Sequence, residues 1–103
     1  MALKPSDLHV LLALHEGPLH GYGIMKQVEQ QSGGEVRLEL GSLYRLISRL
    51  LQEGLIEENG GDERRRFYQL TRTGRRTLKA EAARLAGLLA LMRARNLVPV
   101  ADS

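Results

Sequence analysis

The chain has 103 residues, of which 43% are hydrophobic and 26% charged, and it contains no cysteine. This length is enough for one small domain and too short for two. The lack of cysteine excludes disulfides and thiolate metal sites, and no apolar run approaches the roughly 20 residues that span a bilayer. Because the first residues also lack the pattern of a secretory signal, we expect a cytoplasmic protein.

The net charge of +3 is unevenly distributed. Residues 1–58 hold five Lys/Arg and eight Asp/Glu, whereas residues 59–103 hold ten Lys/Arg and four Asp/Glu. Seven of those ten cations lie within residues 64–79. Clustering of one sign of charge favours a polyanionic partner, with nucleic acid ahead of an anionic membrane surface.

Two helices are predicted in the first third of the chain. Ser6 can cap the first helix, which Gly17-Pro18 ends. His20-Gly21-Tyr22-Gly23 turns into the second, which Ser32-Gly33-Gly34 ends. Residues 35–40 then alternate polar and apolar side chains, which predicts a short half-buried strand or an extended segment.

Residues 41–54 predict a third helix with two chemically different faces. Leu43, Leu46, Ile47 and Leu50 are spaced as the buried stripe of an amphipathic helix. The opposite side carries cations and hydrogen-bonding groups but no acid: Ser42, Arg45, Ser48, Arg49 and Gln52. Ser42 can cap this helix and Gly54 can end it. Such a helix suits the DNA major groove, and the alternative is an ordinary solvated surface helix.

A β-hairpin and a long helix follow. Residues 55–58 and 64–70 predict two strands joined by a polar glycine-rich loop, with three arginines at the tip. Of the adjacent rings in the return strand, Phe67 is predicted to face the core and Tyr68 the outside, because Phe67 has no polar atom. Thr71 can cap the last helix, predicted to run from about Arg72 to about Asn96.

The order of elements predicts a mainly α fold with a small β-hairpin, namely a winged helix-turn-helix domain over residues 1–71. Residues 72–98 are predicted to form a C-terminal dimerisation helix, and residues 99–103 a disordered tail. A heptad seam on that helix is the expected dimer interface: Leu78, Ala82, Leu85, Leu88, Leu89 and Met92. The alternative is that the seam packs only on its own domain.

Several strings resemble the PadR family of bacterial transcriptional regulators, in its short type with a single C-terminal helix. They are His20-Gly21-Tyr22, Gly41-Ser42-Leu43-Tyr44, Arg49-Leu50, Glu53-Gly54-Leu55-Ile56, Phe67-Tyr68-Gln69-Leu70-Thr71 and Thr73-Gly74-Arg75. The resemblance implies a dimeric winged-helix repressor that responds to a small effector, often an aromatic one. Two departures are Arg45, where the family commonly has proline, and a hairpin turn without proline.

The expected DNA-binding residues lie on the second helix, the third helix and the hairpin: Tyr22, Ser42, Tyr44, Arg45, Ser48, Arg49, Arg64, Arg65 and Arg66. Arg45 and Arg49 are one helical turn apart and are expected to reach base edges, whereas the three hairpin arginines are expected to bind phosphates. Tyr44 can either contact phosphate near the helix start or pack on the flank of the core. Tyr22 has the same two alternatives, with phosphate contact favoured.

The sequence does not favour catalysis, a cofactor or a metal site. His9, His15 and His20 lack the spacing of metal ligands, and His20 is better suited to shaping or capping its turn. The expected function is therefore a sequence-specific DNA-binding regulator, a homodimeric repressor on a palindromic operator that a small hydrophobic effector releases. The alternative is a winged-helix interaction module whose basic wing binds a protein or RNA.

Overall fold

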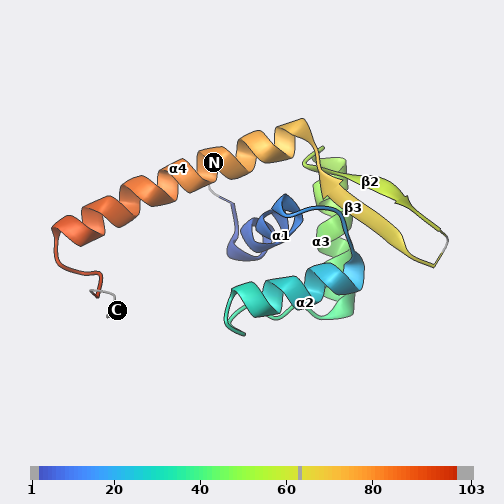
Figure 1. Cartoon of the computed structure of the whole chain (residues 1–103), viewed down its shortest axis with the longest axis horizontal. Helices are drawn as coiled ribbons and strands as arrows, with labels where there is room; N and C mark the ends of the chain where they lie inside the picture. The colour runs from blue at the N-terminus through green and yellow to red at the C-terminus, as the bar shows by residue number, and fades with distance from the viewer. Residues whose placement is uncertain (1–2, 63, 100–103) are drawn as a thin grey trace.

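The computed structural model describes residues 3–62 and 64–99, and Figure 1 shows the arrangement of its elements. Four helices and three strands follow one another as α1 (Pro5–His15), β1 (Leu19–His20), α2 (Gly21–Gln31), α3 (Leu40–Gln52), β2 (Ile56–Gly61), β3 (Arg66–Leu70) and α4 (Arg72–Ala94). This mainly α architecture with a small hairpin confirms the predicted fold class. The part of the predicted tail at residues 100–103 lies outside the described residues.

The starts of α1 and α3 differ from the prediction. Pro5 is the first residue of α1 and Lys4 precedes it, so Ser6 is not the cap. The fixed φ of proline suits the first helical position, where no amide hydrogen bond is lost. Similarly, α3 begins at Leu40, which places Ser42 inside its first turn instead of at the cap.

Two side-chain caps agree with the sequence. His20 Nδ1 accepts a hydrogen bond from the Gly23 amide at 3.1 Å, so the imidazole caps α2. Thr71 Oγ1 accepts one from the Gly74 amide at 2.9 Å at the start of α4. Both caps satisfy amides that have no partner within the first helical turn.

The three strands form one antiparallel sheet in the order β1-β3-β2. The short strand β1 was not predicted; it pairs Leu19 with Tyr68 and His20 with Phe67. The prediction for the two rings was wrong, because Tyr68 is buried and Phe67 is half-buried with its ring edge against His20. Alternation along β3 explains the reversal, since Tyr68 shares its face with the buried Leu70.

The segment between α2 and α3 is extended and forms no strand in the described residues. Gly33 and Gly34 have φ of +63° and +83°, a left-handed conformation that glycine adopts without steric cost and that ends α2. Val36 and Leu38 are half-buried and pack against the core. Of the two predicted alternatives, the extended segment is the one observed.

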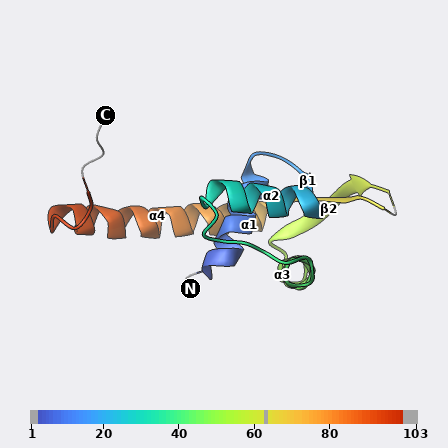
Figure 2. The ribbon, with the colours of Figure 1, turned by 90° about the horizontal axis from the view of Figure 1, so that it is seen from below.

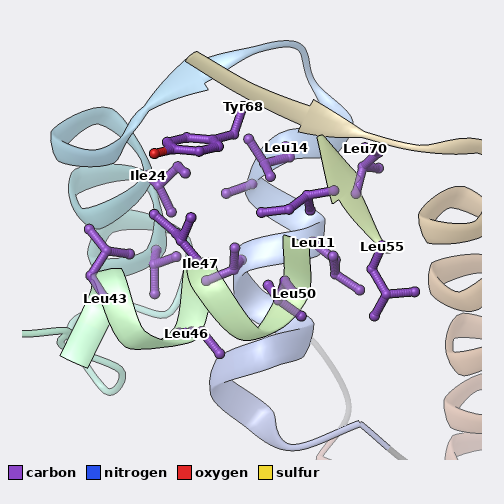
Figure 3. Packing of buried hydrophobic residues seen from close by; sticks show 14 of the residues in the cluster. Leu11, Leu14, Ile24, Leu43, Leu46, Ile47, Leu50, Leu55, Tyr68 and Leu70 are labelled. Atoms are coloured by element: carbon purple, nitrogen blue, oxygen red, sulfur yellow. The ribbon is translucent and has the colours of Figure 1, made fainter. Parts of the chain in front are cut away.

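The core lies between α1, α2, α3 and the inner face of the sheet, and Figure 3 shows its side chains converging from these elements. The apolar stripe of α3 is fully inside it: Leu43, Leu46, Ile47 and Leu50. Burying four such side chains favours the fold by roughly 6–12 kcal/mol before entropy is considered. Because this stripe is packed into the core, the opposite face of α3 points to solvent.

Helix α4 leaves this domain as a long projection, at the opposite end of the molecule from the β2–β3 hairpin (Figures 1 and 2). The molecule accordingly measures 51 × 26 × 22 Å. The buried residues of α4 all lie in its first half: Gly74, Leu78 and Glu81. The Leu3 amide donates to Glu81 Oε2 at 2.7 Å.

The Glu81 carboxylate is ionised in this arrangement. The hydrogen bond from Arg84, followed by that from the Leu3 amide, lowers the pKa of Glu81 below its usual value. A lowered pKa in the folded state contributes stability above the ordinary carboxyl pKa, and this contribution is lost as the pH falls through the folded value.

The joint between α4 and the domain generates the first prediction. A Cβ at Gly74 would lie 2.0 Å from the Leu55 carbonyl oxygen, whereas a Cβ at Gly87 meets nothing within 4 Å. Gly74→Ala should destabilise the protein by about 1–3 kcal/mol, because the backbone must shift to admit the methyl group. Gly87→Ala should instead stabilise it by about 0.8–1 kcal/mol through helix propensity. Urea denaturation of both variants measures the contrast, and equal effects would contradict the close contact at Gly74.

Candidate nucleic-acid interface

The outer face of α3 presents Arg45, Ser48 and Gln52 to solvent. These side chains lie opposite the buried stripe, as expected for positions three, four and seven residues apart. Arg45 Nη2 lies 3.5 Å from Ser42 Oγ, and this is its one hydrogen bond among the described residues. Arg45 is therefore exposed on the surface, with donors that can meet a base edge.

Arg49 lies on the flank of α3 and is bound to the protein itself. Its Nη2 donates to Asp7 Oδ1 at 2.7 Å and its Nη1 to Asp7 Oδ2 at 2.9 Å, a two-pronged ion pair with α1. Glu53 Oε1 lies 3.3 Å from Nη1. Neither contact was predicted from the sequence. The hydrogen bonds that Arg49 donates to Asp7 raise the pKa of Arg49.

Tyr44, also exposed, lies on the other flank of α3, against the start of α2. A Cβ at Gly21 would lie 2.7 Å from Tyr44 Oη, so the phenol lies close to the Gly21 backbone and would have to move to admit a side chain there. Tyr44 thus packs on a neighbouring backbone while half of its surface stays in solvent. Tyr22 is more exposed, and Lys26 Nζ lies 5.3 Å from the centre of its ring.

The hairpin tip is built around Asp62. Its Oδ1 accepts hydrogen bonds from the amides of Arg64 and Arg65 at 2.9 and 2.8 Å, and the Asp62 amide donates to the Arg65 carbonyl at 2.8 Å. The hydrogen bonds from these two amides, that of Arg65 first, lower the pKa of the Asp62 carboxyl. Arg66 is paired with Glu58 at 3.2 Å. The side chains of the three arginines are all exposed.

A groove of about 590 Å³ joins these parts. Its lining comes from the start of α2, one side of α3 and the hairpin, and includes Tyr22, Tyr44, Ser48, Tyr68 and Arg64–Arg66. Burial, followed by the nearby Glu58 carboxylate, raises the pKa of the Tyr68 phenol, which therefore stays neutral. The groove combines hydrogen-bonding groups with three cations, the chemistry that binds phosphates and base edges.

The predicted seam on α4 divides into two parts. Leu78 is buried within its own domain, whereas Leu85, Leu88 and Leu89 are 36%, 44% and 37% exposed. Ala82 is also exposed and Met92 is half-buried. A second groove, of about 550 Å³, lies between α1 and α4 and has Leu8, Leu12, Ala82 and Leu85 among its apolar walls and His15, Arg75 and Lys79 among its polar ones.

Two of the three histidines have structural partners. His20 caps α2, and His9 Nδ1 lies 3.0 Å from Gln31 Nε2. Within residues 3–62 and 64–99 no group of three or more His, Asp or Glu side chains is arranged to hold a metal ion. The same part of the chain contains no helix long and apolar enough to cross a membrane.

Comparison with known sequences finds a matching family and a similar protein. The sequence profile described as the transcriptional regulator PadR-like family matches residues 10–80. An uncharacterized 37.1 kDa protein in transposon TN4556 of Streptomyces fradiae is 42% identical over 90 residues. That match covers 84% of this chain and 26% of the relative, so the chain spans about a quarter of that protein's length.

Solved structures show the same fold. A PadR family transcription regulator from hypervirulent Clostridium difficile R20291 superposes with a TM-score of 0.77 at 24% identity, over 88% of this chain and 97% of that one. Bacillus subtilis PadR, solved in complex with operator DNA, superposes with a TM-score of 0.67 at 22% identity. This second match covers 75% of this chain and 46% of that one.

The hairpin tip generates the second prediction. Asp62→Ala removes the acceptor of two amide hydrogen bonds, so the amides of Arg64 and Arg65 should exchange with solvent faster. Asp62→Asn keeps a side-chain oxygen at the same place and should retain most of the protection. Amide hydrogen exchange followed by NMR measures both variants at one pH. Equal protection in Asp62→Ala and the unaltered protein would mean that this side chain does not order the tip.

Proposed function

The chain belongs to the PadR-like family of transcriptional regulators, and from this premise we propose that it is a homodimeric repressor that reads a palindromic operator and is released by a small hydrophobic effector. Family membership supports a transcriptional regulator that binds DNA, and we propose no catalytic activity. Repression, the dimer, the palindrome and the effector are the proposal. We also propose that the protein acts in the cytoplasm, where DNA is accessible.

One observation carries the proposal: the side of α3 that holds Tyr44 and Ser48 borders the same groove as the hairpin arginines. A helix with an exposed polar face can enter the major groove, which is wide enough to admit it. The hairpin, which lies beside the helix, is then positioned to contact the sugar-phosphate backbone that flanks the major groove. In this orientation the domain of residues 1–71 binds DNA, and residues 72–98 form a separate dimerisation element.

We assign two kinds of contact to the site. Arg45 and Ser48 point outward from α3 and are assigned to base edges, with arginine suited to guanine. Phosphate contact is assigned to a larger set near the helix starts and on the hairpin: Tyr22, Ser42, Tyr44, Arg64, Arg65 and Arg66. Arg49, which the sequence also suggested for base edges, is assigned no contact with DNA, because its guanidinium is held by Asp7. Gln52 shares the outer face and joins the candidates.

The dimer is proposed to form through the projecting part of α4. Leu85, Leu88 and Leu89 expose apolar surface at heptad spacing, with Ala82 and Met92 on the same side. Leu78, which the sequence analysis included, is already covered by its own domain and lies at the edge of this seam. Exposed apolar side chains in this pattern support a second copy as the partner.

The effector is proposed to occupy the groove between α1 and α4. Leucine and alanine side chains offer an apolar ligand a place to bury its surface, and Arg75 and Lys79 at the edge favour a ligand with a negative charge. Because α1 packs on α2 and β3 and α4 carries the seam, a ligand here would bias how two domains are oriented.

The second candidate function is an interaction module that uses its basic hairpin for a protein or RNA. The cluster of arginines favours it equally well, since charge alone does not select DNA. Selection of bound duplexes from a random DNA pool separates the two functions. A recovered palindromic motif supports the repressor, whereas recovery of no preferred sequence supports the module.

The proposed dimer generates the third prediction. Leu85→Asp places a carboxylate in the seam at a cost of roughly 3 kcal/mol or more, unless it is protonated. We expect a shift from dimer to monomer in analytical ultracentrifugation, together with weaker DNA binding. Ala90→Asp adds the same charge to an exposed residue of α4 on the side away from the seam, and it should remain dimeric. A dimer that withstands Leu85→Asp would place the interface elsewhere.

The two groups of arginines generate the fourth prediction. If about six phosphates are neutralised per dimer, log K should fall with log salt at a slope of roughly −5. Arg64→Ala should weaken binding to operator and scrambled duplexes alike and make the slope shallower by about 1 for each phosphate that is no longer neutralised. Arg45→Ala should cost about 1–3 kcal/mol on the operator and change binding to scrambled DNA little.

Competitive binding to the selected operator and to a scrambled duplex, at several salt concentrations, measures both effects. Arg37→Ala is a suitable control, since this exposed arginine is paired with Glu29 and lies outside the groove. If Arg64→Ala alone relaxed sequence preference, the roles of α3 and the hairpin would be the reverse of those assigned.

A further inference from the structure

The ion pair between Asp7 and Arg49 joins two elements that are distant in the sequence. Asp7 is in the first turn of α1, and Arg49 is in the last turn of α3, 42 residues later. Both carboxylate oxygens accept from different terminal nitrogens of the guanidinium, at 2.7 and 2.9 Å. This two-pronged geometry restricts both the position and the rotation of the arginine side chain.

The two partners differ in their access to water. The side chain of Asp7 is 6% exposed, whereas that of Arg49 is 42% exposed. A carboxylate removed from water needs a charged partner, so Asp7 is strongly dependent on Arg49. Arg49 reaches the surface and has a second acid, Glu53, within 3.3 Å.

The position of Arg49 on α3 gives this pair a consequence for recognition. Arg49 is one turn after Arg45 and lies beside the outer face, so its guanidinium would reach a DNA backbone if it were released. A cation that meets phosphate adds affinity for every sequence equally and adds no discrimination. Holding Arg49 on α1 removes that non-selective contribution.

We infer that Asp7 is a positioning residue for DNA recognition, which holds Arg49 away from the DNA backbone and leaves Arg45 as the arginine of α3 that contacts DNA. This inference rests on the proposed function of the groove. Asp7 itself touches no nucleic acid. Its effect is exerted through Arg49 and appears as a lower affinity for DNA of unrelated sequence.

The test measures binding to a scrambled duplex as a function of salt for the full chain, four variants of the ion pair and one control. Asp7→Asn removes the charge, and Asp7→Ala removes every acceptor and excludes a residual hydrogen bond to Arg49. Arg49→Gln removes the cation, and Asp7→Asn/Arg49→Gln removes both partners. Glu53→Gln is the matched control, because it removes the other, half-exposed carboxylate but leaves the Asp7 contacts intact.

In Asp7→Asn and Asp7→Ala the released Arg49 should bind scrambled DNA more tightly. The slope of log K against log salt should steepen by about 0.9 for each additional phosphate that is neutralised, or about 1.8 for a dimer. Preference for the selected operator over the scrambled duplex should fall correspondingly. Arg49→Gln, the double variant and Glu53→Gln should all keep the slope of the unaltered protein. A thermal melt of each variant sets a binding temperature at which all are folded.

Three results would overturn the inference. A shallower slope in Arg49→Gln would mean that Arg49 contacts phosphate in the unaltered protein. An unchanged slope in both Asp7 variants would mean that Asp7 does not restrain Arg49. Weaker binding to all DNA without a change of slope would assign Asp7 a purely structural role. If the unaltered protein bound neither duplex, the proposed function itself would fail, and this result is distinct from the other three.

Discussion

Burial of one side of α3 is the constraint on which the rest of the structure depends. Four apolar side chains of this helix are in the core, so the helix cannot rotate about its axis without exposing them. The polar side is consequently presented to solvent in one fixed orientation. Tyr44 packed on Gly21 and Arg49 paired with Asp7 hold the two flanks of the same helix. Packing therefore orients the polar side chains that we propose for DNA contact.

The hairpin is attached to this unit by a different kind of interaction. Strand β3 is central in the sheet, and its Tyr68 and Leu70 side chains enter the core beside α1, α2 and α3 (Figure 3). The base of the hairpin is therefore rigid, while its tip depends on local hydrogen bonds to Asp62. Core packing therefore positions the hairpin as a whole. The hydrogen bonds to Asp62 order the backbone at Arg64 and Arg65.

Local patterns predicted much of this structure, and interactions between distant residues account for part of what was missed. The stripe of α3, the caps at His20 and Thr71 and the hairpin all follow from spacing and residue type within a few positions. The pairing of Asp7 with Arg49 does not, because it depends on how α1 crosses α3. The reversal of Phe67 and Tyr68 is different, because the alternation of Tyr68 with Leu70 along β3 is a local signal, and only the pairing of β3 with β1 involves distant residues. Within the candidate site, the types of residue could be predicted from the sequence. Which side chains are exposed, and which are paired with other residues, depends on the fold.

The close approach of Gly74 to the Leu55 carbonyl has a geometric consequence for the proposed dimer. Because the start of α4 packs closely against the domain at Gly74, the direction of the α4 axis is fixed relative to α3, the helix that we propose binds DNA. Each residue along α4 adds about 1.5 Å of rise and about 100° of rotation. The position of the seam along α4 therefore determines both the separation and the angular phase of the two α3 helices. These two quantities in turn select the spacing of half-sites on the duplex, where one turn is about 34–36 Å.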